Sequence, residues 1–256
     1  MNKLERHEHI LHLAGERGTI YLNRAVKVTG ASLPTIRRDF DELSESGSVE
    51  RIRGGIRVRR KDGNVPFSLR EVRHSNEKSA IAREAVRQLR PGDVIFVDGG
   101  TTTYHICFHL PQVPLRIITN SLRLSAYLDD AAERFPDWEV YLTGGKIHHG
   151  SNMLTGPGTV HSLRFYHADW AFLSVGGIAA DGLYNTSESI VETERTMIEC
   201  CDQAVVLADQ SKLGKRAMCR VCGIQRITRL ITTKPEGRSL VEEDMVEAGL
   251  QITHAL

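Results

Sequence analysis

The chain has 256 residues, of which 41% are hydrophobic and 25% are charged, a composition typical of a soluble globular protein. No stretch approaches the roughly 18 consecutive apolar residues that a membrane helix needs, which excludes an α-helical membrane protein. The N-terminal stretch MNKLERHEHILHLAGERG is too charged for a secretory signal, so we expect a cytoplasmic protein that has no membrane partner.

The five cysteines are expected to be free thiols. An odd count in a reducing compartment argues against a disulfide framework. Cys219 and Cys222 have zinc-knuckle spacing, but no second CxxC and no nearby His pair completes four ligands. We therefore predict neither a metal site nor a bound cofactor.

Charge is distributed unevenly along the chain. Residues 1–60 carry a net charge of +4 and the remainder carries −3, although the whole chain is near neutral at +1. Basic charge gathered at one end favours an end that meets a polyanion.

The first 58 residues are predicted to form three short helices and a hairpin. Apolar stripes indicate helices over 5–17 and about 23–29, and each stripe is followed by a glycine. In SLPTIRRDFDELSESG, residues 32–47, Ile36, Phe40 and Leu43 recur with helical spacing. Ser32 is placed to cap this third helix, and Pro34 lies in its first turn, where a missing N–H costs nothing.

Next comes a basic hairpin. Two short strand-like runs, over 49–58, are joined around Gly54 and Gly55. Three helices and such a hairpin make a winged helix-turn-helix, whose third helix can enter the major groove of operator DNA. The alternative for Arg38 is an ion pair with Glu42 on an ordinary surface helix. The predicted DNA-binding residues are Ser32, Pro34, Thr35, Arg37, Arg38, Arg53, Gly54, Gly55 and Arg57.

The rest of the chain is predicted to be an α/β domain. Residues 59–76 are polar and contain a proline, so we expect a linker with a partly helical join. From 77 to 256, buried strands alternate with amphipathic helices, the pattern of a mainly parallel, doubly wound sheet. Ligands of such sheets bind beyond the carboxyl ends of the strands.

Polar and glycine residues follow several of these strands, and they suit a phosphorylated polyol. The helix after Thr101 would present its N-terminus to a phosphate, and Lys212 would add a full charge. The plainer alternatives are tight turns for the glycines and helix capping for the threonines. The predicted effector-binding residues are Asp98, Gly100, Thr101, Thr102, Asn120, Ser121, Gly144, Gly145 and Lys212.

The sequence resembles the DeoR family of bacterial transcriptional regulators over nearly its whole length. It has the family's Ser and Thr-Ile-Arg-Arg-Asp at 32 and 35–39, Gly-Gly at 54–55, Asp-x-Gly-Thr-Thr at 98–102 and Asp-x-Ser-Lys-x-Gly at 209–214. The resemblance implies a sensor domain similar to ribose-5-phosphate isomerase and CoA-transferase folds. It also implies a repressor of carbohydrate utilisation relieved by a phosphorylated sugar. We expect a homo-oligomer, dimer or tetramer, because two DNA-binding units held in one assembly set the spacing of the two half-sites that they recognise.

One segment departs from the family's pattern. Many members have a Glu five residues before a basic residue; counting back from Arg195 gives Ile190, with Glu188 and Glu192 on either side. The alternative function is a sugar-phosphate isomerase or deaminase, for which Asp181 is a candidate base. However, Leu183 stands where the deaminases have a His, and no matching acid is evident nearby. We therefore predict no catalytic residues and a protein that is not an enzyme.

Overall fold

The computed structural model describes residues 1–45, 47, 49–59 and 65–256. Within them the chain divides into two compact units, Met1–Ser75 and Asn76–Leu256, which are described separately.

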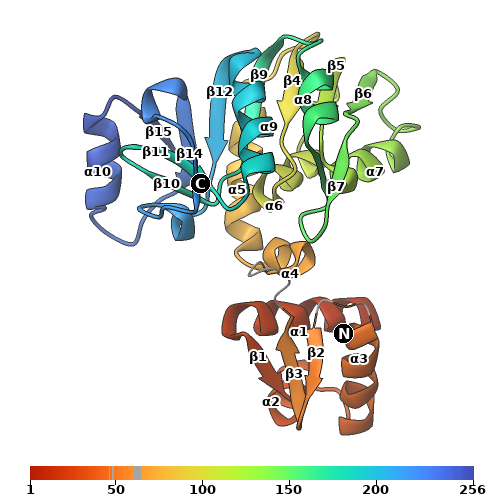
Figure 1. The fold of residues 1–256 in the computed structure, drawn as a ribbon. Coiled ribbons are helices and arrows are strands. Elements are labelled where there is room, and N and C mark those ends of the chain that lie inside the picture. Colours follow the sequence, from red (N-terminus) through yellow and green to blue (C-terminus); the bar gives the residue numbers. More distant parts are fainter. Residues whose placement is uncertain (46, 48, 60–64) are drawn as a thin grey trace. The chain divides into compact units, whose positions relative to one another are not determined.

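The N-terminal unit is a winged helix-turn-helix, as predicted (Figure 1). Its strands form one antiparallel sheet in the order β1-β3-β2, and the pairing of β1 with β3 was not anticipated from the sequence. Its elements are α1 (Lys3–Arg17), β1 (Thr19–Tyr21), α2 (Leu22–Thr29), α3 (Leu33–Glu45), β2 (Val49–Ile52), β3 (Gly55–Val58) and α4 (Phe67–Val72).

A single apolar cluster holds this unit together. Ile10 of α1, Ile36 and Phe40 of α3 and Ile56 of β3 are all fully buried in it. Leu69 of α4 is also fully buried in this cluster, so part of the segment expected to be linker completes the core of the N-terminal unit. Residues 60–64, which fall in the same expected linker, lie outside the described residues.

The larger unit contains a seven-stranded sheet in the order β15-β14-β12-β9-β4-β5-β6, and every adjacent pair is parallel. One half of the sheet consists of β9 (Ala168–Leu173), β4 (Val94–Val97), β5 (Leu115–Thr119) and the edge strand β6 (Trp138–Leu142). The other half consists of β12 (Cys201–Leu207), β14 (Arg229–Thr233) and the edge strand β15 (Gln251–Ala255).

Helices cover both faces of this sheet, which confirms the doubly wound architecture. Strand residues alternate between two cores: Ile95 and Val97 face one, and Phe96 faces the other. The first core is covered by α5 (Ser75–Val86), α6 (Thr101–Tyr104), η1 (His105–Phe108) and α7 (Leu122–Asp130). The second is covered by α8 (Pro157–Leu163), α9 (Glu188–Glu199) and α10 (Leu240–Glu247).

The order of the strands reverses between β4 and β9. The chain passes from β4 outward to β5 and β6, then returns to β9 on the other side of β4 and continues outward to β15. Such a switch point opens a crevice at the carboxyl ends of the two strands, where α/β proteins bind ligands.

Two small sheets lie outside the main one and were not predicted. A hairpin consists of β7 (Lys146–His148) and β8 (Met153–Thr155). An antiparallel sheet consists of β10 (Gly177–Ala179), β11 (Gly182–Asn185) and β13 (Cys219–Cys222). The short helices η2 (Gln210–Lys212) and η3 (Ile224–Arg226) complete the unit. Among the described helices, none combines the length and the apolar character needed to cross a membrane.

Candidate functional site

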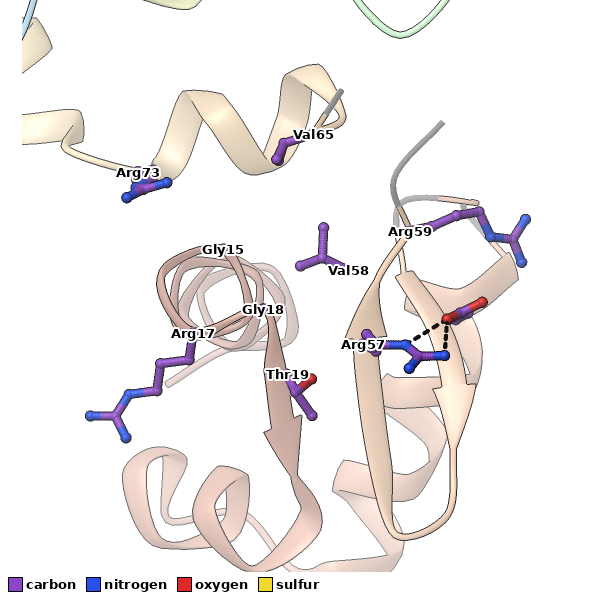
Figure 2. A pocket seen from close by; sticks show the side chains of 10 residues that line it. Gly15, Arg17, Gly18, Thr19, Arg57, Val58, Arg59, Val65 and Arg73 are labelled. Atoms are coloured by element: carbon purple, nitrogen blue, oxygen red, sulfur yellow. Dashed lines mark hydrogen bonds and ion pairs between the residues drawn. The ribbon is translucent and has the colours of Figure 1, made fainter. Parts of the chain in front are cut away.

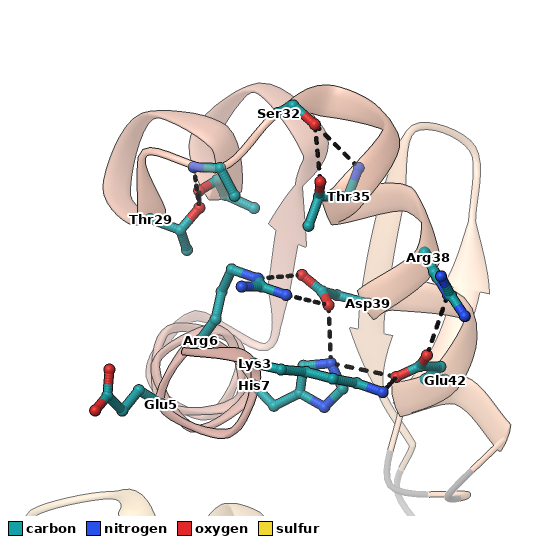
Figure 3. A network of polar contacts seen from close by, with 12 residues as sticks. Lys3, Glu5, Arg6, His7, Thr29, Ser32, Thr35, Arg38, Asp39 and Glu42 are labelled. Carbon is teal, nitrogen blue, oxygen red and sulfur yellow. Dashed lines mark hydrogen bonds and ion pairs between the residues drawn. The ribbon is translucent and has the colours of Figure 1, made fainter. Parts of the chain in front are cut away.

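Helix α3 has one buried face and one exposed polar face. Ile36, Phe40 and Leu43 are buried, as their spacing predicted, whereas Arg37 and Arg38 are exposed. At the leading end, the backbone N–H of Thr35 donates to Ser32 Oγ at 3.4 Å, and the two hydroxyl oxygens lie 2.8 Å apart (Figure 3). Ser32 therefore occupies the capping position predicted for it, and the exposed end carries a compact group of hydroxyl and guanidinium donors.

The two expectations for Arg38 are compatible. Arg38 Nε lies 3.5 Å from Glu42, so the predicted ion pair exists, yet the Arg38 side chain is 84% exposed (Figure 3). A pair this exposed contributes little stability and is easily exchanged for another anion.

Asp39 fixes the orientation of α3 on α1. It is buried and accepts hydrogen bonds from Arg6 Nε at 2.5 Å and Arg6 Nη2 at 2.9 Å, while His7 Nε2 lies 3.0 Å away (Figure 3). Burial raises the pKa of Asp39, but the hydrogen bonds and charges of Arg6 and His7 outweigh burial and hold that pKa below its usual value. The aspartate of the Thr-Ile-Arg-Arg-Asp signature is thus buried inside the unit, where it anchors α3 to α1.

The same acids do not suggest a metal site. Ligand atoms of His7, Asp39 and Glu42 lie within 4.8 Å of one another. However, Arg6 already donates hydrogen bonds to both carboxylate oxygens of Asp39, and Lys3 Nζ lies 2.7 Å from Glu42. The positive charges of Arg6 and Lys3 beside these acids oppose the binding of a metal cation.

The wing, which is the hairpin formed by β2 and β3, is shaped by its two glycines. Gly54 has φ +75°, a conformation that L side chains rarely adopt, and its carbonyl accepts from the N–H of Leu22 at 2.9 Å. A Cβ added at Gly55 would lie 2.5 Å from the carbonyl oxygen of Ile20 in β1. Gly55 therefore lets β1 pair closely with β3, because a side chain at this position would collide with β1. Gly54 forms the turn.

The basic side chains of the wing are partly neutralised. Arg57 pairs across the hairpin with Glu50 at 2.7 Å, and Arg51 lies 3.1 Å from Asp41 of α3. Arg53, beside the turn, is exposed. Of the wing residues predicted to bind DNA, Arg53 is thus the more available cation, and Arg57 would have to exchange Glu50 for a phosphate.

The base of the wing, away from the Gly54 turn, is hollowed into a basic cavity of about 590 Å³. Its lining includes Arg17, Arg57, Arg59 and Arg73, which are labelled in Figure 2. Within the described residues the cavity has one acid, Glu50, which Arg57 engages.

In the sensor unit, Asp98 lies at the switch point itself. It follows β4, is 1% exposed, and accepts through Oδ2 from Ser174 Oγ at 2.9 Å and from the N–H of Ser174 at 3.3 Å, beyond the end of β9. Its other oxygen, Oδ1, is buried without a partner among the described residues. Burial raises the pKa of Asp98, and the hydrogen bonds from Ser174 and the backbone oppose that increase.

The glycines after Asp98 allow this close approach. A Cβ at Gly100 would lie 1.7 Å from Ser174 Oγ, and one at Gly99 would lie 2.6 Å from the Cβ of Met153. Thr103 ties the turn together by donating to the carbonyl of Asp98 at 2.6 Å and accepting from the N–H of Gly100 at 3.0 Å.

Asn120 and the β7–β8 hairpin cover the crevice. Asn120 Nδ2 donates to the carbonyl of Leu154 at 3.1 Å, and the N–H of Leu154 donates to the carbonyl of Asn120 at 2.8 Å. Asn120 is fully buried, and its Oδ1 has no hydrogen-bond partner among the described groups. The hairpin is therefore docked on the carboxyl edge of the sheet, directly over the turn that follows β4.

The remaining predicted effector residues have different surroundings. Thr101 and Thr102 are buried in α6, which is a single turn, so the helix dipole available to a phosphate is weaker than the sequence suggested. Ser121 caps α7 by accepting from the N–H of Leu124 at 3.2 Å. Lys212 is half-buried in η2, beyond the carboxyl end of β12.

Gly144 and Gly145 are exposed and are explained by packing. The Gly144 carbonyl accepts a hydrogen bond from Thr159 Oγ1 at 2.7 Å. A Cβ at Gly145 would lie 2.1 Å from Thr159 Oγ1. These glycines let the turn after β6 approach the start of α8, which is the plainer alternative considered for them.

Glu194 of α9 is a buried carboxyl group that the sequence analysis missed. It is 1% exposed, its Oε1 accepts from Asn185 Nδ2 at 2.6 Å, and its Oε2 is buried with no hydrogen-bond partner in the described chain. Burial, followed by the charge of Asp98, raises the pKa of Glu194 well above its usual value. A signal was present, because Glu194 lies on the apolar stripe of α9 with Ile190, Met197 and Ile198.

The structure weakens the candidate base of the enzyme alternative. Asp181 is exposed in the β10–β11 turn, accepts from Tyr184 Oη at 2.6 Å and pairs with Arg216 at 3.1 Å. Hydrogen bonds from Tyr184 and then Arg216 lower the pKa of Asp181, which makes it a poorer proton acceptor. Arg195 likewise serves the structure, donating to the carbonyls of Val221 and Arg220 in β13.

The cysteines are free thiols, as expected. Cys219 and Cys222 lie on one extended strand, so three residues separate them by roughly 10 Å, too far for a disulfide. Burial raises the pKa of Cys222 to about 11 and that of Cys201 to about 12.

Comparison with known families assigns both units. Residues 6–62 match the model of the DeoR-like helix-turn-helix domain, and residues 73–234 match that of the DeoR C terminal sensor domain. The chain belongs to the DeoR family. It is therefore a DNA-binding transcriptional regulator, as its sequence motifs predicted.

Curated relatives match this DeoR-family chain over most of both lengths. The uncharacterized HTH-type transcriptional regulator YulB of Bacillus subtilis is 32% identical over 230 residues, covering 89% of this chain and 88% of YulB. The HTH-type transcriptional regulator UlaR of Escherichia coli is 29% identical over 246 residues, covering 95% of this chain and 96% of UlaR.

Solved structures similar to this DeoR-family chain include the full-length sorbitol operon regulator SorC of Klebsiella pneumoniae, at 15% identity and a TM-score of 0.37 over 80% of this chain and 88% of SorC. Another is ribose 5-phosphate isomerase A of Methanocaldococcus jannaschii, at 18% identity and a TM-score of 0.38 over 54% of each chain.

Proposed function

We propose that this DeoR-family regulator represses a carbohydrate-utilisation operon and releases its operator when a phosphorylated sugar binds the sensor unit. The observation that carries the DNA-binding part is the arrangement of α3. Its apolar face is buried in the core of the N-terminal unit, and Asp39 is held by Arg6 of α1. Its leading end carries the exposed residues Ser32, Arg37 and Arg38 and the half-buried Thr35. Such an end is suited to base edges and phosphates in the major groove.

The proposed effector site is the crevice between β4 and β9. Three buried oxygens there, Asp98 Oδ1, Asn120 Oδ1 and Glu194 Oε2, have no hydrogen-bond partner in the described part of the chain. Unpaired buried acceptors cost free energy, and a ligand that donates hydrogen bonds to them recovers it. A sugar supplies several hydroxyl donors, while Thr101, Thr102 and Lys212 remain our proposed phosphate contacts.

Ligand-dependent release requires different effector affinities in the DNA-bound and free states. We propose a homo-oligomer in which two winged units read paired half-sites, so that a change in their spacing lowers operator affinity.

The test is a mobility-shift titration of the full-length protein on fragments from upstream of its own and neighbouring genes, with and without a panel of sugar phosphates. The proposal predicts a salt-sensitive complex with one fragment that a panel member dissociates. Incubation of the same panel without DNA serves as the second arm. Rapid conversion of a sugar phosphate, with no retarded fragment, would contradict the proposal in favour of the isomerase or deaminase alternative.

A further inference from the structure

The sheet of the sensor unit has an edge that invites pairing. In the described chain β6 is the last strand on its side of the sheet, next to β5 (Figure 1). Edge strands are normally shielded by proline, by charges or by a covering segment, because their outer backbone groups can pair with another strand. Strand β6 reads Trp-Glu-Val-Tyr-Leu, and Val140 and Leu142 are 38% and 45% exposed. Its single acid, Glu139, is already engaged by Tyr141 Oη at 2.7 Å and by Arg116 at 3.2 Å.

The backbone of β6 directs a row of hydrogen-bonding groups away from the sheet. The N–H of Thr143, just beyond the strand, donates to the carbonyl of Thr119 in β5 at 2.9 Å. Because backbone groups alternate in direction along a strand, those of the odd-numbered residues face β5 and those of the even-numbered residues face outward. The N–H and carbonyl groups of Val140 and Leu142 and the carbonyl of Trp138 therefore form the outer edge.

The same even-numbered residues border an apolar groove. Their side chains lie on the face of β6 that α7 covers, and a groove of about 410 Å³ runs between the strand and the helix. Its apolar lining consists of Ala126, Leu128, Ala132, Phe135, Val140 and Leu142, with Trp138 at one end of the strand. A strand added beside β6 would satisfy the outer backbone groups and cover this groove at once.

A second copy of β6 fits this edge about a two-fold axis at Val140. In an antiparallel pair centred there, Val140 faces itself, Trp138 faces Leu142 of the second copy, and Glu139 faces Tyr141 of the second copy. Apolar side chains then meet on the face of α7, and a hydrogen-bond acceptor meets a donor on the other face. The strand is thus complementary to itself, as a closed two-fold contact requires.

The opposite edge of the sheet does not offer such a contact. Strand β15 exposes Gln251 and His254, and His254 Nε2 lies 2.9 Å from Glu242 of α10. Pairing there would cover polar groups that already have a partner. Pairing of β15 with β6 of another copy would be head-to-tail and would extend into open chains instead of closing.

We infer that β6 is the surface through which two copies of this chain associate, as an antiparallel pair that joins their two sheets into one. This inference rests on the proposed function, because it names the contact that holds two winged units in one assembly. The contact lies within the sensor unit, so the assembly forms without DNA and without effector.

The test places charges on the proposed two-fold axis. Val140→Lys and Val140→Glu each set two like charges opposite each other, so sedimentation of the full-length variants should show self-association weakened about tenfold or more. An equimolar mixture of the two variants sets Lys against Glu and should restore the assembly. Val246→Lys, at a more exposed valine on α10, is the matched control and should sediment like wild type.

Hydrogen exchange of the wild-type protein provides a second reading that needs no variant. The amides of Val140 and Leu142 should exchange more slowly as the protein concentration rises through the range of association. The amides of β15 should exchange at the same rate throughout. This reading also holds if a substitution at Val140 prevents folding.

The outcomes separate this inference from the proposed function. A wild-type monomer, a Val140→Lys assembly of wild-type size, or exchange at β6 that ignores concentration overturns the β6 contact, and the titration on operator fragments still decides the regulator. Folded variants that dissociate alone but do not associate when mixed overturn the pairing about Val140. If Val140→Lys dissociates yet binds the operator as tightly as wild type, the β6 contact stands and the paired reading of half-sites fails.

Discussion

The Asp39–Arg6 pair is predicted to be the main polar support of the DNA-reading helix. The side chains are 3% and 13% exposed, and the two hydrogen bonds measure 2.5 and 2.9 Å. Removing one partner of a buried pair costs about 3–5 kcal/mol. Because asparagine retains one acceptor for Arg6, we expect Asp39→Asn to cost about 3 kcal/mol.

For a unit of this size, about 1 kcal/mol corresponds to a shift in melting temperature of roughly 4–8 °C, so the N-terminal unit should melt about 12–24 °C lower. Asp41→Asn is the matched control on the same helix. Asp41 is 60% exposed and pairs with Arg51 at 3.1 Å, so its loss should cost about 1 kcal/mol or less.

The assay must report on α3, and tryptophan fluorescence does not, because Trp138 and Trp170 both lie in the sensor unit. Hydrogen exchange of peptides spanning 33–45 in the full-length protein measures the local free energy of unfolding directly. Operator affinity, measured in parallel, should fall with the population of ordered α3.

Protonation gives an independent check on the same pair. The pKa of Asp39 is lowered in the folded state. Its contribution to folding stability is therefore complete above the ordinary aspartate pKa of about 3.9, and it is lost as the pH falls through the lower pKa of the folded state. The difference between wild type and Asp39→Asn should therefore shrink in acid. Equal protection of α3 in Asp39→Asn and Asp41→Asn at neutral pH would refute the reasoning.

Three further results are expected. Arg37→Ala and Arg38→Ala should each weaken operator binding by about 1–3 kcal/mol in a mobility-shift titration if the guanidinium reads a base, and unchanged affinity in both would remove α3 from the interface. Gly55→Ala should destabilise the N-terminal unit, because the new Cβ would meet the carbonyl of Ile20 at 2.5 Å; thermal melting like that of wild type would show that β1 yields. Lys212→Ala should reduce effector-induced release of the operator while leaving affinity for DNA intact, and a normal effector response would exclude Lys212 from the site.

Much of the architecture was predictable because it depends on local periodicity. Ile36, Phe40 and Leu43 identify the buried face of α3, and Ser32 marks its start. Strands followed by glycines identified the parallel sheet. The strand β1 was missed because three residues carry too little pattern, and its identity depends on pairing with Gly55 of β3.

The site was predicted less completely, because it depends on which side of a helix faces the sheet. Glu188, Glu192 and Glu194 look alike in the sequence, and only the last is buried. Its position on the stripe with Ile190 and Met197 was the available signal, since a glutamate there must be paired or protonated. Asp39 was likewise part of a recognised motif, but its partner Arg6 lies 33 residues away.

The most direct measurement of the central claim is operator affinity as a function of salt, for the wild type and an Arg37→Ala/Arg38→Ala double variant, with and without a panel sugar phosphate that stabilises the sensor unit. We predict that wild-type affinity falls steeply with salt, that the double variant binds more weakly with a shallower slope, and that the sugar phosphate weakens the wild-type complex. Identical salt slopes for the two proteins, or a complex indifferent to every sugar phosphate that binds the sensor unit, would contradict the account.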